Sequence, residues 1–360
     1  MQTFQATRDS RFICNIFGPI HLENGKNYYG YSKLARDLVV KKAAHIQSLT
    51  LTAAEFSKGD LPQEGEKKRG LLIHSGGYGD TMTVGILLPL LEDKFGIAFD
   101  ISCHHDKWQY LLKPMGFRGG WVPYPIDLKS LENYDCLLPS ITKYVHEPTR
   151  LLRESPLEVV AESFGLSVDS MKFGYTIPEK EKIRARLPKG NAIRLGLNFD
   201  SMGAVKSYPR DLQPVLIRSL LPLGFDIFLF GTAPISDEVP VYDTHLFDLT
   251  GKTSIFELAA LLSQMDLILA MDSFVAHLAA LLGKRTTVLL STTMEAYFKH
   301  YNSVRALNSK MPCAPCFQTG DLCPSGFHQC RAFYHPSLHP QRIVSSTIKE
   351  LSTQYGRSHK

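Results

Sequence analysis

From Gly70 onward, short apolar segments of strand length alternate with longer segments whose apolar residues recur at helical spacing. In the first half, strands are predicted at 71–73, 98–103, 121–124 and 135–138, and helices at 81–95, 107–114 and 156–165. After Pro188 the alternation starts again, with strands predicted at 193–198, 225–230, 245–249, 267–271 and 286–290, and helices at 212–221, 254–263, 273–282 and 341–351. Such alternation builds parallel sheets covered on both faces. The pattern predicts an α/β protein with two Rossmann-like domains.

The first 65 residues do not follow this alternation. Short strands are predicted near 12–17 and 21–31, Asn24-Gly25 favours a hairpin turn, and the polar stretch 59–68 is typical of a linker. The expected organisation is an N-terminal extension at 1–65, a first Rossmann-like domain at 66–188, a second at 189–335 with a Cys-rich loop at 311–331, and a C-terminal helix and tail at 336–360. The extension is expected to bind the acceptor or a partner chain.

Composition narrows the class of protein only slightly. The 360 residues are 44% apolar, and 40 basic against 35 acidic side chains give a net charge of +5, which is too mild to indicate nucleic-acid binding. Residues 1–14 lack the apolar run of a signal peptide, and no stretch approaches the roughly 18 apolar residues of a membrane span. A cytoplasmic protein is expected, with contact at the inner face of the membrane and oligomerisation left open.

Candidate chemistry in the first domain lies in the glycine-rich turn at 74–80, where a strand ends and a helix begins. The turn lacks both the dinucleotide fingerprint and the lysine of a P-loop. Asp80 stands at the start of the helix, where it is either a helix cap or a carboxylate that takes a proton from an attacking hydroxyl. Asp80 is therefore the candidate catalytic base, and Gly77 and Gly79 belong to the expected donor-binding set.

Three segments of the second domain also follow predicted strands. Together with the turn at 74–80 they lie at the carboxyl ends of strands, where open parallel sheets bind ligands. Lys206 follows the first strand and offers a charge for a diphosphate; a solvated surface lysine is the alternative. Thr250, Gly251 and Lys252 precede a helix with a capping box, and Asp272, Ser273 and His277 open the next helix, whose N-terminus suits phosphate. Asp237 or Glu238 is expected to bind ribose hydroxyls. The alternatives are that these polar residues only cap their helices, with no ligand, and that His277 is a packed histidine.

The stretch from Leu249 to Lys284 contains Gly-Lys-Thr-Ser, an Ala/Leu-rich helix, Asp-Ser and His-Leu-Ala-Ala, and it resembles the heptosyltransferases of glycosyltransferase family 9 over about 35 residues. The turn ending in Gly79-Asp80 is similar to the family loop that carries its proposed catalytic Asp, and Lys206 before Pro209 is similar to the family's donor-phosphate segment. Tyr208 stands where the family often has Trp, and Phe274-Val275 stand where it often has Gly-Pro.

The resemblance, over roughly residues 70 to 350, implies a GT-B fold in which two Rossmann-like domains face a cleft, and an inverting transfer without a catalytic metal. It commonly implies ADP-heptose as donor and a bacterial surface glycan such as lipopolysaccharide as acceptor. The sequence contains no Asp-x-Asp motif, which agrees with a metal-independent transferase. The alternatives are transfer to a protein side chain or a nucleic-acid base, a non-catalytic protein that binds sugar nucleotides, and a sugar-nucleotide epimerase.

Four cysteines gather in the Cys-rich loop, at Cys313, Cys316, Cys323 and Cys330. Four thiolates can close a tetrahedral site around a structural zinc or iron ion, which would pin a loop rich in Pro and Gly. The spacing resembles metal-holding loops near the C-terminus of some family members. Free thiols or a single disulfide are the alternatives, although persistent disulfides are disfavoured in the cytosol.

Overall fold

The computed structural model describes residues 2–6, 10–14, 18–24, 26–30, 44–47, 54–55, 68–138, 152–171, 173–187, 192–240, 242–318 and 320–355. The chain forms two compact units. The N-terminal unit comprises Met1–Glu147 and Pro156–Phe173, and the C-terminal unit comprises Pro148–Ser155 and Gly174–Lys360. The first 65 residues therefore group with the N-terminal unit, and residues 59–67 of the predicted linker lie outside the described residues.

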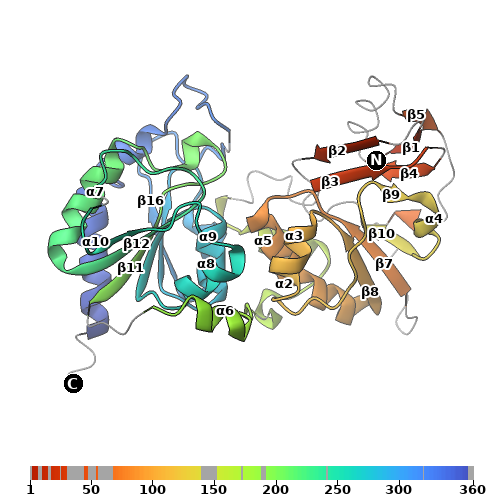
Figure 1. Cartoon of the computed structure of the whole chain (residues 1–360), viewed down its shortest axis with the longest axis horizontal. Coiled ribbons are helices and arrows are strands. Elements are labelled where there is room, and N and C mark those ends of the chain that lie inside the picture. The colour runs from red at the N-terminus through yellow and green to blue at the C-terminus, as the bar shows by residue number, and fades with distance from the viewer. Residues whose placement is uncertain are drawn as a thin grey trace. The chain divides into compact units, whose positions relative to one another are not determined.

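The N-terminal unit contains a parallel sheet in the order β6 (Ala54–Glu55), β10 (Cys136–Leu138), β7 (Lys68–Ile73) and β8 (Ile97–Ser102). Helix α2 (Tyr78–Phe95) follows β7 and contacts α5 (Pro156–Ser163) (Figure 1). Because β7 and β8 are adjacent and parallel, the segments that follow them meet at one edge of this sheet.

Strands of the N-terminal segment and the later strand β9 form a second, antiparallel sheet in the order β5 (Ala44–Gln47), β1 (Gln2–Ala6), β4 (Asn27–Gly30) and β9 (Ile126–Asp127). Strands β2 (Ser10–Cys14) and β3 (Gly18–Leu22) pair with each other. A turn is present where Asn24-Gly25 predicted one, with the Lys26 N–H donating to the Glu23 carbonyl. In the described residues, however, its flanking strands join different sheets, so the predicted hairpin is wrong.

The C-terminal unit contains six parallel strands in the order β13 (Leu246–Asp248), β12 (Phe225–Phe230), β11 (Ile193–Asn198), β14 (Leu267–Met271), β15 (Thr286–Leu290) and β16 (Val304–Asn308). The chain runs outward from β11 to β13 and then crosses back to β14. Strand order therefore reverses between β11 and β14, and ligands of open parallel sheets bind at the carboxyl ends beside such a point.

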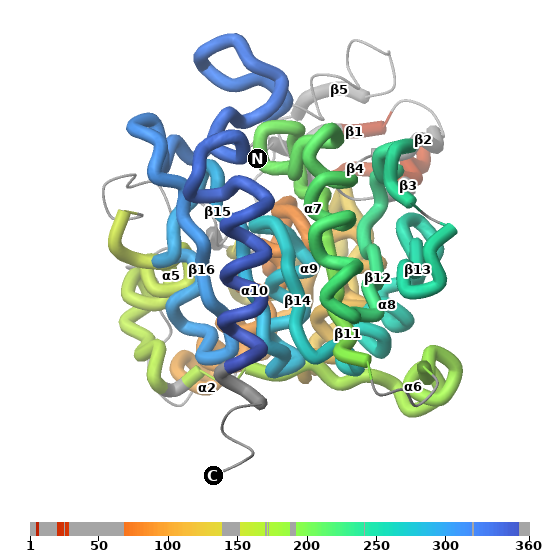
Figure 2. Tube along the Cα trace, turned by 90° about the vertical axis from the view of Figure 1, so that its left-hand side faces the viewer, coloured from red at the N-terminus to blue at the C-terminus, as the bar shows by residue number. Residues whose placement is uncertain are grey.

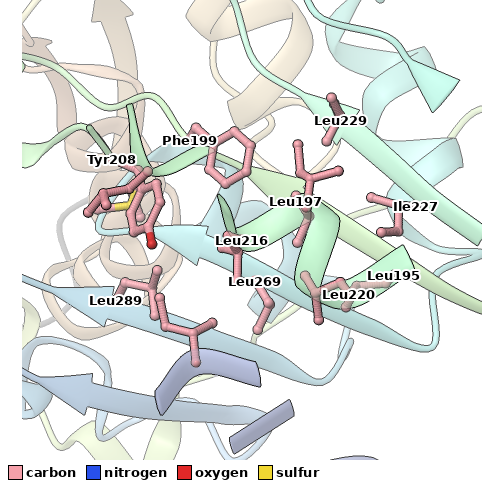
Figure 3. Packing of buried hydrophobic residues seen from close by; sticks show 14 of the residues in the cluster. Leu195, Leu197, Phe199, Tyr208, Leu216, Leu220, Ile227, Leu229, Leu269 and Leu289 are labelled. Atoms are coloured by element: carbon pink, nitrogen blue, oxygen red, sulfur yellow. The ribbon is translucent and has the colours of Figure 1, made fainter. Parts of the chain in front are cut away.

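Helices cover both faces of this sheet. Helices α7 (Leu212–Leu220) and α10 (Pro340–Tyr355) lie side by side on one face (Figure 2), and α8 (Ile255–Leu262) and α9 (Phe274–Leu281) lie on the other (Figure 1). Every residue of β14 and β15 is buried, as the continuous apolar runs predict. The core between the sheet and α7 is built from leucines of the strands and of the helix, including Leu197, Leu216 and Leu269 (Figure 3).

Several elements differ from the predicted ones. The helix expected at 107–114 is split into α3 (His105–Lys107) and the π-helical segment η1 (Trp108–Leu112), and the strand expected at 121–124 is reduced to a bridge between Trp121 and Ile101. The sequence pattern missed α4 (Leu128–Leu131) and α6 (Glu179–Arg184), which are short helices. It also missed β16, most of whose residues are only half buried. The described part of the chain also contains short 3₁₀ helices at Val168–Ser170 (η4), Ala204–Lys206 (η5), Leu221–Leu223 (η6), Glu295–Phe298 (η7) and Arg331–Tyr334 (η8). Among the described helices, none is both long and apolar enough to cross a bilayer.

Candidate functional site

The loops after β11 and β14 are joined by three polar contacts at the point where strand order reverses. The Ser201 hydroxyl donates to the Asp272 carbonyl at 2.6 Å, and the Ser273 hydroxyl donates to Asn198 Oδ1 at 2.8 Å. Lys206 Nζ lies 2.9 Å from Asp272 Oδ2. The structure therefore brings two of the segments chosen from sequence into one cluster, which we call the switch-point cluster: Asn198, Ser201, Lys206, Asp272 and Ser273.

The ion pair of Lys206 and Asp272 is largely buried, since the two side chains are only 14% and 10% exposed. Burial alone would raise the pKa of Asp272, but the charge of Lys206, the Thr293 hydroxyl at 2.6 Å and the charge of His277 together lower it. Asp272 is therefore a carboxylate at neutral pH. Lys206 is not the free cation that its sequence context suggests, because Asp272 offsets its charge.

His277 lies near the cluster, one turn into α9. Its ring stacks on Phe298 with centroids 4.7 Å apart, and its Nδ1 is 3.3 Å from the Tyr301 hydroxyl. Burial raises the pKa of Tyr301, so that hydroxyl stays neutral. Ser273, at the N-cap of α9, makes no side-chain bond to the first turn because its hydroxyl is directed at Asn198. The first-turn N–H groups of α9 are therefore not capped by Ser273.

The segment after β13 is organised by its own residues. Asp248 Oδ1 accepts from the Thr250 N–H at 3.0 Å and from the Thr250 hydroxyl at 2.6 Å, and Lys252 Nζ donates to the Asp248 carbonyl at 2.8 Å. The Gly251 N–H donates to the Gly231 carbonyl, and the predicted capping box of α8 is present at Ser254 and Glu257. Thr250, Gly251 and Lys252 follow a strand two positions from β11, so they lie on the same edge of the sheet as the switch-point cluster. Their hydrogen bonds given above are to residues outside that cluster.

Asp237 and Glu238 lie beside α7. Both are exposed, and the Glu238 carbonyl accepts from Arg218 Nη2 of α7 at 2.9 Å. This loop also packs Val239 into the core with α7. Among the described residues, no hydrogen bond or ion pair links Asp237 or Glu238 to the switch-point cluster.

Asp200, which sequence reasoning did not assign, stands two residues beyond β11. Its Oδ2 accepts from the Thr232 N–H at 2.8 Å, the Thr232 hydroxyl at 2.9 Å and the Ala233 N–H at 3.2 Å. A Cβ at Gly231, where φ is 142°, would collide with Asp200 Oδ1, so a side chain is disfavoured there on two grounds. Asp200 therefore holds the loop after β12 in place. Its position directly after a buried strand is the sequence feature that could have identified it.

In the N-terminal unit, Asp80 is the third residue of α2 and is exposed. The N-cap of the helix is Gly77, and not Asp80 as the capping alternative expects. Asp80 Oδ2 instead accepts from the Gly77 N–H at 2.8 Å and so supports the helix start from its third position. Among the described residues, Oδ1 has no hydrogen-bond partner. A Cβ at Gly76 would lie 2.6 Å from the Asp80 Cβ, so glycine is required for this close turn. The cap therefore fixes the carboxylate and leaves one oxygen available.

Two buried polar residues support this turn. His74 Nε2 lies 3.0 Å from the Thr81 hydroxyl, which itself donates to the Gly77 carbonyl, so Nε2 carries the proton. Burial, with a contribution from Lys107, lowers the pKa of His74 to about 3, and the ring is neutral. Lys107 Nζ donates to the Gly76 carbonyl at 2.6 Å. Sequence reasoning missed Lys107 because an isolated lysine in a helix is usually solvated.

The Cys-rich loop packs against the Lys206 segment. Asp321 Oδ1 accepts from the Ala204 N–H at 3.0 Å, and the Thr292 carbonyl accepts from the Cys316 N–H at 3.0 Å. The four thiols are free, with Cys313 exposed and Cys330 buried, so they lie at different depths. Within the described ranges no three His, Cys, Asp or Glu side chains are arranged to hold a metal ion, so the predicted four-thiolate geometry is not formed.

Comparison with known proteins identifies the family. A family model described as glycosyltransferase family 9 (heptosyltransferase) matches residues 136–325, more than half of the chain. No curated protein sequence matches. The solved structure of E. coli ADP-heptose LPS heptosyltransferase II has a TM-score of 0.58 and 16% identity, covering 80% of this chain and 99% of that one.

Two further solved structures share the fold. TibC, described as a bacterial iron-containing dodecameric glycosyltransferase from enterotoxigenic E. coli H10407, has a TM-score of 0.60 and 12% identity, covering 85% of this chain and 81% of that one. A family 9 glycosyltransferase from Veillonella parvula DSM 2008 has a TM-score of 0.52 and 16% identity, covering 69% and 88%. The predicted GT-B-like α/β class is confirmed by these folds. The chain belongs to glycosyltransferase family 9, the heptosyltransferase family, and is a glycosyltransferase.

Proposed function

We propose that this glycosyltransferase moves a heptose from ADP-heptose to a hydroxyl of a bacterial surface glycan such as lipopolysaccharide. The family description supports a heptose donor, and the solved relatives include an ADP-heptose LPS heptosyltransferase and TibC in complex with ADP-D-beta-D-heptose. The observation that carries the proposal is the switch-point cluster, because it places a lysine, a carboxylate and an uncapped helix start where parallel sheets bind nucleotides.

In the proposed complex the donor diphosphate lies against the N-terminus of α9. Lys206 Nζ has three protons, so it can keep its contact with Asp272 and donate to a phosphate oxygen as well. The first-turn N–H groups of α9 donate to the same phosphates, and Asp272 and His277 orient the donor. Thr250, Gly251 and Lys252 line the phosphate side. Lysine and amide groups stabilise the departing diphosphate, so no catalytic metal is required.

The proposed transfer is a single displacement with Asp80 as the general base. Asp80 Oδ1, which has no partner among the described residues, accepts the proton of the acceptor hydroxyl, while Oδ2 keeps its bond to Gly77. The acceptor oxygen forms a bond to the anomeric carbon from the side opposite the diphosphate. The bond from that carbon to the diphosphate oxygen breaks, and the nucleoside diphosphate leaves with the electron pair. The product therefore has inverted anomeric configuration.

A panel of nucleotide sugars tests the donor. At one hundred times its Kd a ligand stabilises the folded protein by about 2.7 kcal/mol, so ADP-heptose is expected to raise the Tm by about 5 °C. GDP- and UDP-linked sugars at equal concentration are expected to raise it by less. A larger shift with a GDP- or UDP-linked sugar would contradict the donor, and binding of ADP-heptose without transfer to heptose-free lipopolysaccharide would contradict the acceptor.

We further propose that Cys313, Cys316, Cys323 and Cys330 hold a structural iron or zinc ion after rearrangement of their loop. Support comes from the four cysteines in one short segment and from the iron-containing description of TibC. Purified protein is expected to contain about one metal ion per chain by elemental analysis. Cys313→Ser with Cys316→Ser should remove it, whereas Cys136→Ala, outside the loop, should not. Metal-free wild-type protein from a mild purification would refute the site.

A further inference from the structure

An aromatic cluster lies at the carboxyl end of β8 in the N-terminal unit. The ring centroid of His105 is 4.9 Å from that of Trp121 and 5.4 Å from that of Trp108. These are the only two tryptophans of the chain, and both are partly exposed. We call His105, Trp108 and Trp121 the aromatic platform. Other large aromatic side chains, such as Phe99 and Phe333, are fully buried, so the platform is distinct from the core.

The backbone holds both indole rings in place. Trp108 Nε1 donates to the Gly119 carbonyl at 3.1 Å, and Trp121 Nε1 donates to the Cys103 carbonyl at 2.9 Å. Each indole N–H is therefore already satisfied, so the rings can offer a ligand only their π surface. Lys113 Nζ covers one face of Trp108, so the surface offered is chiefly that of Trp121. A surface that is held rigid before binding loses little conformational entropy when a ligand docks.

The platform lies on the same sheet edge as the Asp80 turn. His105 opens α3 after β8, and Lys107, two residues later, donates to the Gly76 carbonyl at 2.6 Å in the turn after β7. Lys107 Nζ also lies 5.7 Å from the ring centroid of Tyr78 in that turn. The segment that carries the platform is therefore joined through Lys107 to the turn that carries Asp80, at the edge where β7 and β8 end. Lys113 Nζ, 4.0 Å from the Trp108 ring centroid, adds a positive charge at the platform.

We propose that the aromatic platform binds a pyranose ring of the acceptor glycan and presents its hydroxyl to Asp80. The C–H groups of a pyranose are weakly positive and pack on the negative faces of aromatic rings. Lys113 suits an acceptor that carries an acidic substituent. This assignment rests on the proposed glycan acceptor and adds the surface of this chain that recognises it.

Tryptophan fluorescence tests the platform directly, because the whole tryptophan emission of the protein comes from Trp108 and Trp121. The probe is the oligosaccharide released from heptose-free lipopolysaccharide, titrated without donor. Saturable quenching or a blue shift is expected. If wild-type protein transfers heptose to this oligosaccharide but its emission does not change on titration, the platform is refuted and the proposed function stands. If wild-type protein does not transfer heptose to this oligosaccharide, both the proposed acceptor and the platform are refuted.

Kinetic constants of variants provide the second arm. Trp121→Ala is expected to raise the KM for the acceptor about tenfold, while the KM for ADP-heptose and the rate of donor hydrolysis by water stay within twofold. Trp121→Phe should restore the acceptor KM to within about threefold. Tyr242→Ala, which removes an exposed aromatic ring from the C-terminal unit, is the matched control and should change neither constant. An unchanged acceptor KM in Trp121→Ala and Trp108→Ala would overturn the assignment.

Discussion

Lys206→Met is expected to destabilise the protein by about 3 kcal/mol or more, because it leaves the buried Asp272 carboxylate without its cationic partner. The remaining contacts of Asp272, the Thr293 hydroxyl and the charge of His277, do not replace a lysine 2.9 Å away. Denaturant unfolding of wild-type and variant protein measures the difference. Lys252→Met is the matched control, since Lys252 is 60% exposed and its pair with Asp248 contributes little.

The double variant Lys206→Met/Asp272→Asn separates charge from packing. Removing both charges avoids a buried unpaired carboxylate, so most of the lost stability should return. If Lys206→Met and the double variant are equally unstable, the cost comes from packing of the lysine stem, and the ion pair is not the cause. If Lys206→Met is as stable as the wild type, the pair contributes nothing.

The pair also predicts a pH dependence. The pKa of Asp272 is lowered below its ordinary value of 3.8, so the folded state holds the carboxylate charged more strongly than the unfolded state does. Its contribution to stability is therefore fully present well above pH 3.8 and is lost as the pH falls through the lowered value. The stability difference between wild type and Asp272→Asn should be constant near neutral pH and shrink only in acid.

Asp80→Asn is expected to lower kcat by about 10²- to 10⁴-fold while the KM for ADP-heptose changes little. The asparagine can still accept the Gly77 N–H, so the start of α2 should stay intact and the Tm should shift only slightly. What is lost is the ability to take a proton from the acceptor hydroxyl. Steady-state kinetics with both substrates varied separates kcat from the two KM values.

Asp93→Asn is the control for this experiment, because Asp93 is another exposed carboxylate on α2 and lies near the opposite end of the helix. It should leave kcat and both KM values unchanged. A normal kcat in Asp80→Asn would show that Asp80 only caps the helix, and the general base would have to be sought elsewhere in the N-terminal unit.

Elements with a strong local signal could be predicted from the sequence. The strands β14 and β15 are wholly buried, and their sequences are largely apolar. The capping box at Ser254 and Glu257 predicts the start of α8. Strand β16 is an edge strand with mostly half-buried residues. Because Arg305 and Asn308 interrupt its apolar residues, the sequence does not predict a strand there. Strand β4 pairs with β9, about 100 residues away, and no local pattern specifies that partner.

The sequence predicts individual residues of the candidate site but not which of them contact one another. Sequence position put Lys206 and Asp272 at strand ends, but only the order of strands in the sheet makes β11 and β14 neighbours and brings the two charges together. Thr293 and Lys107 had no distinctive context, because a threonine after a strand and a lysine in a helix are usually solvated. Asp237 and Glu238 follow β12 in the sequence, but the pattern does not show that Glu238 bonds through its carbonyl to Arg218 of α7 and that Val239 packs into the core.

Calorimetric titration of ADP into the protein is the most direct test of whether the switch-point cluster holds the donor diphosphate. ADP is expected to bind wild type, Asp80→Asn and Asp93→Asn with similar Kd, and to bind Lys206→Met/Asp272→Asn about tenfold to a hundredfold more weakly, since a charged hydrogen bond to phosphate is lost. Equal affinity of the folded double variant and the wild type would contradict a diphosphate site at this cluster.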